Sequence, residues 1–307
     1  MKVYTPRRVR ERNRWLRSDG KPNFSSRVHE KPPELEPILR RDAPTATSST
    51  NILRVCELMT QERVRLVPIV TPDNSVEGVV TGMDIIDFLG GGPKHRLVES
   101  RGYTLIYKVL DIPVGEIMEK RAIVADVDMK LTEVLELMIR EGVGALPVVS
   151  KRGFEGVITE RELMKYLAGK PVGVKVGEVM TKEVITVPQN LTVLDAMKLM
   201  VETGVRRLPV TEDGVVKGIL VWRGVVDYVG THKIFEELSS QSIFEFYSFP
   251  ITKVMRREVV TASEDMDLGD AAQLMFDRNV GSLLVTEDTV LKGIITERDI
   301  IYGLVAR

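Results

Sequence analysis

Three short segments of the sequence each carry a threonine followed three residues later by an acid. They are Thr81 and Asp84 in GVVTGMD, Thr159 and Glu162 in GVITERE, and Thr296 and Asp299 in GIITERD. A threonine at the start of a helix can donate its hydroxyl to a phosphate, and an acid one turn further can accept both hydroxyls of a ribose. The same spacing also forms a capping box, which needs no ligand.

A fourth segment, GILVWRG, has Val221 and Gly224 at the two positions and still continues into the helix-like VVDYVG. The fold is therefore not expected to need the threonine–acid pair. Capping boxes also favour glutamate as the acid, whereas two of the three acids here are aspartates. Both observations favour a ligand-binding role in the three complete copies, and no ribose contact is expected in the fourth.

The four heptads close four copies of one longer unit. Residues 114–143, 176–205 and 251–280 match one another closely, and residues 38–64 form a looser copy. Each unit predicts a short strand, an amphipathic helix, two strands joined by a turn, and a second helix. In the second copy the apolar face of the helix consists of Leu131, Val134, Leu135 and Met138.

The fold class expected from this pattern is α/β (α+β), with four β-α-β-β-α repeats. A single unit would expose an apolar helix face and a sheet edge, so the repeats are expected to form two pairs. The natural divider between the pairs is the AGKPVG stretch at 168–173.

The composition limits the other possibilities. The chain of 307 residues has a net charge of −1, one cysteine and three scattered histidines. These values argue against a polyanion-binding protein as a whole, a disulfide framework and a cysteine zinc site. No apolar run approaches membrane-spanning length and no secretory leader is recognisable, which predicts a cytoplasmic protein. Because no paired base and nucleophile is recognisable, neither catalysis nor a cofactor is expected.

The landmarks V-x-E-[IV]-M, G-x-x-x-L-P-V and G-[IV]-[IV]-T-x-x-D resemble those of the CBS domain, named for cystathionine β-synthase. A chain with four such repeats is similar to the γ regulatory subunit of AMP-activated protein kinase and its stand-alone archaeal relatives. The resemblance implies two Bateman modules packed as a disc, with nucleotides bound in the clefts. The expected boundaries are a basic extension at 1–34 and repeats at 35–92, 110–168, 173–231 and 248–307.

The resemblance also implies roles for the candidate site residues. The acids would bind ribose, and the threonines and nearby cations would bind phosphate. Arg65, Arg206 and Arg207 occupy the position from which arginines of that family point into a central channel. Arg161 and Arg298 lie beside the threonines, at the predicted helix starts. Because Arg65 and Arg206 belong to different pairs, they can converge only if the two pairs stack.

The leading hypothesis is a non-catalytic sensor that binds AMP, ADP or ATP and regulates a protein partner whose identity the sequence does not reveal. S-adenosylmethionine and NAD present the same adenosine and remain alternatives. A second hypothesis is a nucleic-acid-associated scaffold that uses the basic residues 1–20. The sequence does not decide between a single-chain disc and a homodimer.

Overall fold

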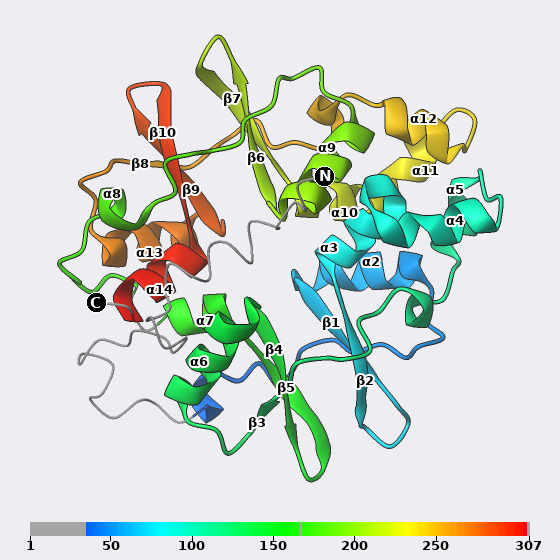
Figure 1. Ribbon diagram of the computed structural model, residues 1–307, viewed down its shortest axis with the longest axis horizontal. Helices are drawn as coiled ribbons and strands as arrows, with labels where there is room; N and C mark the ends of the chain where they lie inside the picture. The colour runs from blue at the N-terminus through cyan, green and yellow to red at the C-terminus, as the bar shows by residue number, and fades with distance from the viewer. Residues whose placement is uncertain (1–34, 166–167, 306–307) are drawn as a thin grey trace, which may run out of the picture.

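The computed structural model describes residues 35–165 and 168–305, so the basic segment 1–20 lies outside the described part of the chain. Four β-hairpins and their helices are arranged around a common centre, as the view down the shortest axis shows (Figure 1). Going around this centre, the repeats follow one another in the order 1, 2, 4, 3. The fold is the mixed α/β arrangement expected from the sequence.

The first two repeats contain the following elements. Repeat 1 and the segment after it comprise η3 (Glu36–Ile38), α2 (Ile52–Gln61), β1 (Leu66–Val70), β2 (Val76–Thr81), α3 (Gly82–Ile86), η4 (Asp87–Gly91), η5 (Pro93–His95), α4 (Arg96–Ser100) and α5 (Ile106–Leu110). Repeat 2 comprises η6 (Val114–Glu116), β3 (Ala125–Asp126), α6 (Leu131–Glu141), β4 (Ala145–Ser150), β5 (Gly153–Thr159) and α7 (Glu160–Met164).

The last two repeats follow the same plan. Repeat 3 and the segment after it comprise α8 (Val176–Val179), α9 (Val193–Thr203), β6 (Arg207–Glu212), β7 (Val215–Val221), α10 (Trp222–Gly230), α11 (Lys233–Glu237) and α12 (Ile243–Ser248). Repeat 4 comprises η7 (Ile251–Lys253), β8 (Thr261–Ala262), α13 (Leu268–Asp277), β9 (Ser282–Glu287), β10 (Val290–Thr296) and α14 (Glu297–Val305).

The helix α6 forms as its apolar spacing predicts. Leu131, Val134, Leu135 and Met138 are all buried, and the helix ends at Gly142, whose φ of 65° suits glycine. The first strand of each repeat is shorter than expected. β3 and β8 have two residues each, while repeats 1 and 3 keep only isolated parallel bridges, Ala46–Ile69 and Val187–Val210.

The sheets join repeat 1 to repeat 2 and repeat 3 to repeat 4. Strands β7 and β10 pair directly and give a five-stranded sheet in the order β6-β7-β10-β9-β8. The sheets of repeats 1 and 2 meet instead through a small apolar cluster that includes Leu66, Val79, Ala145 and Val157. Consecutive repeats therefore form the two expected pairs.

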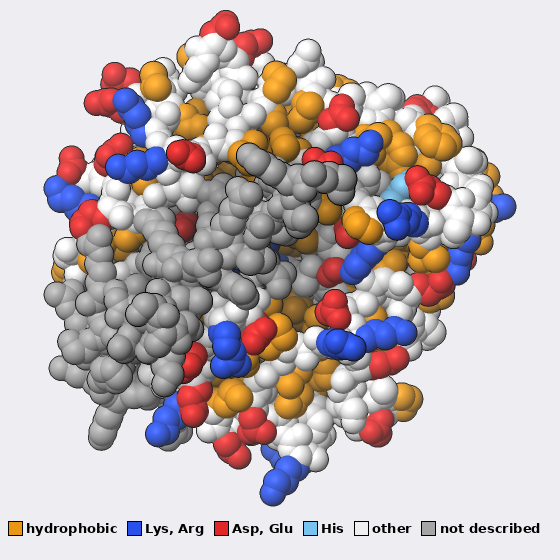
Figure 2. All heavy atoms as spheres, viewed as in Figure 1, with side chains coloured by type: hydrophobic (Ala, Val, Ile, Leu, Met, Phe, Trp, Pro, Cys, Tyr) orange, Lys and Arg blue, Asp and Glu red, His pale blue; other side chains and the backbone are white. Residues whose placement is uncertain are grey.

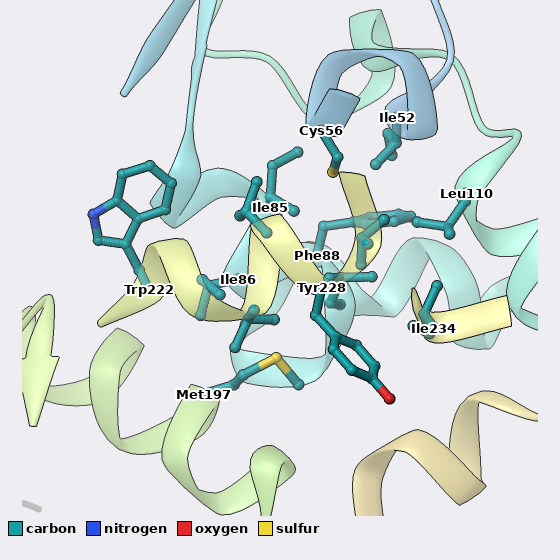
Figure 3. Close-up of a cluster of buried hydrophobic side chains, with 14 of the residues drawn as sticks. Ile52, Cys56, Ile85, Ile86, Phe88, Leu110, Met197, Trp222, Tyr228 and Ile234 are labelled. Atoms are coloured by element: carbon teal, nitrogen blue, oxygen red, sulfur yellow. The ribbon is translucent and has the colours of Figure 1, made fainter. Parts of the chain in front are cut away.

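The helices join the two pairs to each other. One core combines residues of repeats 1 and 3, with α2 packed on α10, and Figure 3 shows side chains of both repeats meeting in it. A second core combines repeats 2 and 4, with α7 packed on α14. Each repeat thus contacts two neighbours, and the ring closes around the centre.

The surface carries mixed charge. Lysine and arginine side chains alternate with aspartate and glutamate over the face drawn in Figure 2, in keeping with the net charge of −1. Among the residues that the structure describes, no helix is both long and apolar enough to cross a bilayer.

Candidate functional site

A cavity of about 1090 Å³ lies between the four repeats and receives residues from each of them. Eight of the candidate residues from the sequence line it. They are Arg65, Thr81, Asp84, Thr159, Arg161, Glu162, Arg206 and Arg207. Arg65 immediately precedes β1, and Arg206 immediately precedes β6, so the stacking of the two pairs brings these arginines from different pairs to one space.

The three other candidate residues lie elsewhere. Thr296, Asp299 and Arg298 are not among the described residues that line this cavity. Asp299 is buried, with 7% of its surface exposed. Arg298 is held against a neighbouring repeat, where its Nε donates to Oε1 of Glu160 at 2.7 Å.

Each threonine–acid pair forms the local contacts of a helix cap. The backbone N–H and Oγ1 of Thr81 donate to Oδ2 of Asp84 at 2.7 and 2.6 Å, and Thr296 makes the same two contacts with Asp299 at 2.9 and 2.8 Å. Thr159 likewise donates to Glu162 from both atoms. One carboxylate oxygen of each acid is therefore used within its own helix start.

Repeat 3, whose heptad has Val221 and Gly224 in place of the threonine and the acid, confirms that the fold does not need the pair. Helix α10 begins after Val221 with no side-chain cap, and Gly224 packs closely on repeat 4's leading segment, where an added Cβ would lie 2.0 Å from the carbonyl oxygen of Val254. The pair is consequently an addition in the other three repeats and not a condition for the helix.

Asp84 has a partner that the sequence did not suggest. Lys94 places its Nζ against Oδ1 of Asp84 and donates to the carbonyl oxygen of Ile117 at 2.6 Å. Lys94 lies near the end of the glycine-rich segment 88–95, in which Gly90 and Gly91 are buried. The Lys94 N–H donates to Oδ1 of Asp87 at 2.7 Å, and this hydrogen bond positions the backbone from which the lysine side chain reaches Asp84. A ribose at Asp84 would have to share this carboxylate with Lys94 or displace it.

Two buried glutamates hold the arginines at the centre. Glu160 is 3% exposed and Glu297 is 2% exposed. Arg65 donates from Nη1 to Oε2 of Glu160 at 3.2 Å and from Nη2 to Oε2 of Glu297. Glu297 also accepts from Nη1 of Arg161 at 3.2 Å, and Glu160 from Arg298 as described above. Burial raises the pKa of Glu160, but Arg298 and Arg65 outweigh it and leave this pKa below its usual value.

Eleven lysine and arginine residues and nine aspartate and glutamate residues line the cavity, so positive charge slightly exceeds negative charge there. Arg207 donates from Nη2 to the carbonyl oxygen of Gly281 at 3.0 Å, and burial lowers its pKa. Arg206 makes no hydrogen bond or ion pair within residues 35–165 and 168–305. Burial and the nearby Arg298 lower the pKa of Arg206 to about 9. Since arginine stays protonated in proteins, such a cavity favours an anionic ligand.

Sequence reasoning missed Lys94, Glu160 and Glu297 as parts of the site. A signal for the glutamates is present in the heptads, because the residue after the threonine position is glutamate in repeats 2 and 4 but Gly82 and Trp222 in repeats 1 and 3. Within the described residues no group of three or more histidine, cysteine or acidic side chains is placed to hold a metal ion.

Comparisons with known proteins agree with the repeat structure. The family model of the CBS domain matches residues 35–91, 114–169, 176–230 and 251–306. This chain is a CBS-domain protein.

Two relatives align with most of the length of this CBS-domain protein. An uncharacterized 33.4 kDa protein in the ribosomal RNA operon of Thermofilum pendens is 33% identical over 258 residues, which cover 84% of this chain and 86% of that protein. The protein MJ1225 of Methanocaldococcus jannaschii is 30% identical over 261 residues, covering 84% of this chain and 93% of its own length.

The crystal structure of MJ1225 superposes with a TM-score of 0.82 at 28% identity, over 88% of this chain and 99% of that one. MJ1225 is described there as a proposed archaeal homologue of γ-AMPK. The ring of four repeats is therefore an arrangement already seen in an experimental structure of a CBS-domain protein.

Proposed function

We propose that this CBS-domain protein is a non-catalytic regulatory protein that binds adenine nucleotides, AMP, ADP or ATP, in the clefts that open on the central cavity. The observation that carries the proposal is the group of arginines at the centre, among them Arg206 with no ion pair to any described residue, beside the threonine–acid pairs of repeats 1 and 2. The arginines would bind the phosphate groups, while the carboxylate of Asp84 or Glu162 would accept hydrogen bonds from the ribose hydroxyls. Thr296 and Asp299 remain candidates for a third cleft outside this cavity.

Regulation would follow from the way the repeats share the cavity. A ligand that contacts repeats from both pairs binds one packing of the pairs more tightly than another, and it shifts the population towards that packing. A partner protein that contacts the ring would detect the shift. The coupling between ligand and partner is reciprocal, so the partner would also change nucleotide affinity.

Asp84→Ala is expected to weaken binding of AMP and of adenosine by the same factor, about tenfold, because a charged acceptor for the shared ribose hydroxyls is lost. Calorimetric titration of protein freed of co-purified nucleotide measures both affinities.

Asp195→Ala is the matched control for this experiment. Asp195 also contacts the threonine at the start of its helix, α9, where Oγ1 of Thr192 donates to Oδ2 of Asp195 at 2.7 Å, but Asp195 does not line the cavity. If both alanine variants changed AMP affinity equally, the effect would belong to helix capping and the ribose role of Asp84 would be rejected. Absence of nucleotide binding by the wild-type protein would reject the proposed function itself.

Lys94→Met should act in the opposite direction to Asp84→Ala. Removing the ammonium group frees Oδ1 of Asp84 for a ribose hydroxyl, so adenosine is expected to bind about tenfold more tightly, the effect of one charge-assisted hydrogen bond. The same calorimetric titration with adenosine measures the change. Weaker adenosine binding by Lys94→Met would mean that the lysine assists the ligand and does not compete with it.

A further inference from the structure

The glycine-rich segment 88–95, which carries Lys94, packs on a helix of repeat 3. A Cβ added to Gly91 would lie 2.8 Å from the carbonyl oxygen of Met197 and 2.9 Å from Cγ2 of Val201, both in α9. Both distances are shorter than any normal contact, so only glycine lets the backbone approach α9 this closely. The position of the segment therefore depends on repeat 3 as well as on repeat 1.

Tyr247 of α12 holds the same segment from another side. Its ring packs on Gly90, where an added Cβ would lie 3.1 Å from Cε1 and from Cζ of the ring. Gly90 has a φ of 137°, a conformation that favours glycine. The hydroxyl of Tyr247 lies 3.1 Å from Nε2 of His95, the residue directly after Lys94. Tyr247 thus contacts the segment both before and after its bend towards the lysine.

The partners of His95 define the direction of its hydrogen bonds. Nδ1 of His95 lies 2.9 Å from the carbonyl oxygen of Phe88, which can only accept, so Nδ1 carries the proton of the neutral ring. Nε2 then accepts from the hydroxyl of Tyr247. Burial raises the pKa of Tyr247, so this hydroxyl keeps its proton at neutral pH. His95 therefore links α12 to the start of the segment, beside Lys94.

These contacts affect what the acid of repeat 1 offers to a ligand. Oδ2 of Asp84 accepts from the N–H and Oγ1 of Thr81, and Oδ1 accepts from Nζ of Lys94. Lys94 is not among the described residues that line the central cavity, so it reaches the carboxylate from outside the cavity. Repeat 3 has Gly224 in place of an acid of its own, yet its helix α9 supports the segment whose lysine occupies the acid of repeat 1.

We propose that Tyr247 and His95 are positioning residues that hold Lys94 against Asp84, so that the packing of α9 and α12 on repeat 1 sets the affinity of the repeat 1 cleft for a ribose. A ribose that needs Oδ1 of Asp84 binds the state in which Lys94 has withdrawn, and contacts that favour the other state lower its apparent affinity. The inference rests on the proposed function, in that Asp84 is the ribose acceptor, but it concerns residues outside the cavity that control this acceptor.

Tyr247→Phe removes the hydroxyl and keeps the ring that packs on Gly90. Adenosine is expected to bind this variant about fivefold more tightly than the wild type, the effect of one neutral hydrogen bond that favours the Lys94 contact. Calorimetric titration of the full chain, freed of co-purified nucleotide, measures the change. An unchanged or weaker affinity for adenosine would overturn the proposal.

The same substitution in the Lys94→Met background tests whether Tyr247 acts through the lysine. Without the ammonium group, Tyr247→Phe should leave the affinity for adenosine unchanged, so the two substitutions should not be additive. An equal gain from Tyr247→Phe in both backgrounds would show that Tyr247 acts by another route, and the positioning role would be rejected.

Tyr228→Phe is the matched control for the loss of a buried tyrosine hydroxyl. Tyr228 is 4% exposed, belongs to the same core as Tyr247 and does not line the cavity. Its substitution should leave the affinity for adenosine unchanged. A gain as large as that of Tyr247→Phe would mean that general loosening of the core is the cause and would contradict the proposal.

Hydrogen exchange tests the positioning role without any nucleotide. The Lys94 N–H donates to Asp87, so its exchange reports the opening of the segment. Tyr247→Phe is expected to speed exchange of this amide about fivefold, and Tyr228→Phe is expected to leave it unchanged. Unchanged exchange in Tyr247→Phe would reject the positioning role even if adenosine binds. If exchange changes as expected while neither the wild type nor Lys94→Met binds AMP or adenosine, the hold of Tyr247 on Lys94 stands and the proposed nucleotide site is rejected.

Discussion

Replacing Arg65 with methionine is expected to lower the free energy of unfolding by about 3 kcal/mol at neutral pH, the lower end of the range for breaking a buried ion pair. Among the described residues, Arg65 alone forms ion pairs with both buried glutamates, and its side chain is only 21% exposed. Without it Glu160 and Glu297 keep one arginine partner each but lose the cation between them. Methionine fills a similar volume, so the loss would come mainly from charge.

The effect of this substitution should depend on pH with a definite sign. Glu160 has a lowered pKa in the native state, as described above. Such a carboxylate contributes stability above the pKa of the unfolded chain, about 4.3, and loses that contribution as pH falls through the native pKa. Urea denaturation should therefore show a full difference between wild type and Arg65→Met at neutral pH and a smaller one below about pH 4.

Arg152→Met is the control for charge removal at the surface. The side chain of Arg152 is 85% exposed and pairs with Glu155 at 3.3 Å, so its loss should cost under about 0.5 kcal/mol. If Arg65→Met cost no more than Arg152→Met, or if its cost did not change in acid, the buried glutamates would not depend on Arg65.

Gly82→Ala is expected to lower the free energy of unfolding by about 3 kcal/mol, although alanine favours helices by about 1 kcal/mol over glycine. Gly82 is the first residue of α3, and Trp222 is the first residue of α10. A Cβ on Gly82 would lie 1.9 Å from Cζ3 of Trp222, whose surface is only 7% exposed. The indole ring lies at the edge of the core shared by repeats 1 and 3, as Figure 3 shows, and a shift away from the added methyl group would weaken its packing there.

A double-mutant cycle with Trp222→Leu isolates this contact. In the Trp222→Leu background Gly82→Ala should be neutral or stabilising, because the smaller side chain leaves room for the methyl group. Gly102→Ala serves as a control with open space around the Cβ, where the left-handed φ of 61° alone should cost about 1 kcal/mol. Equal losses for Gly82→Ala with and without Trp222 would contradict the steric explanation.

Both predictions concern contacts between repeats that are distant in the sequence. Arg65 lies 95 residues from Glu160 and 232 residues from Glu297 along the chain. Trp222 packs on Gly82 because repeats 1 and 3 share one core. Neither contact follows from local spacing, and each would be affected by any ligand or partner that alters how the two pairs stack.

The sequence alone determined the repeat and its elements. Four heptads and the strands before them predicted four β-α-β-β-α units, because apolar periodicity and turn residues act over a few neighbouring positions. The same local reasoning identified Arg65, Arg206 and Arg207 as cations at equivalent strand starts. It also left open whether each threonine–acid pair caps a helix or binds a ligand, since both uses need the same spacing.

Only the tertiary structure decided which charges meet. In the structure Lys94 contacts Asp84, and Asp299 is buried outside the central cavity. Arg65 forms ion pairs with both Glu160 and Glu297, whereas Arg206 forms an ion pair with neither. Equivalent residues in four repeats have nearly the same local sequence, so local sequence cannot distinguish their partners. The partners are set by the packing of helices between the two pairs, which depends on side chains throughout both shared cores.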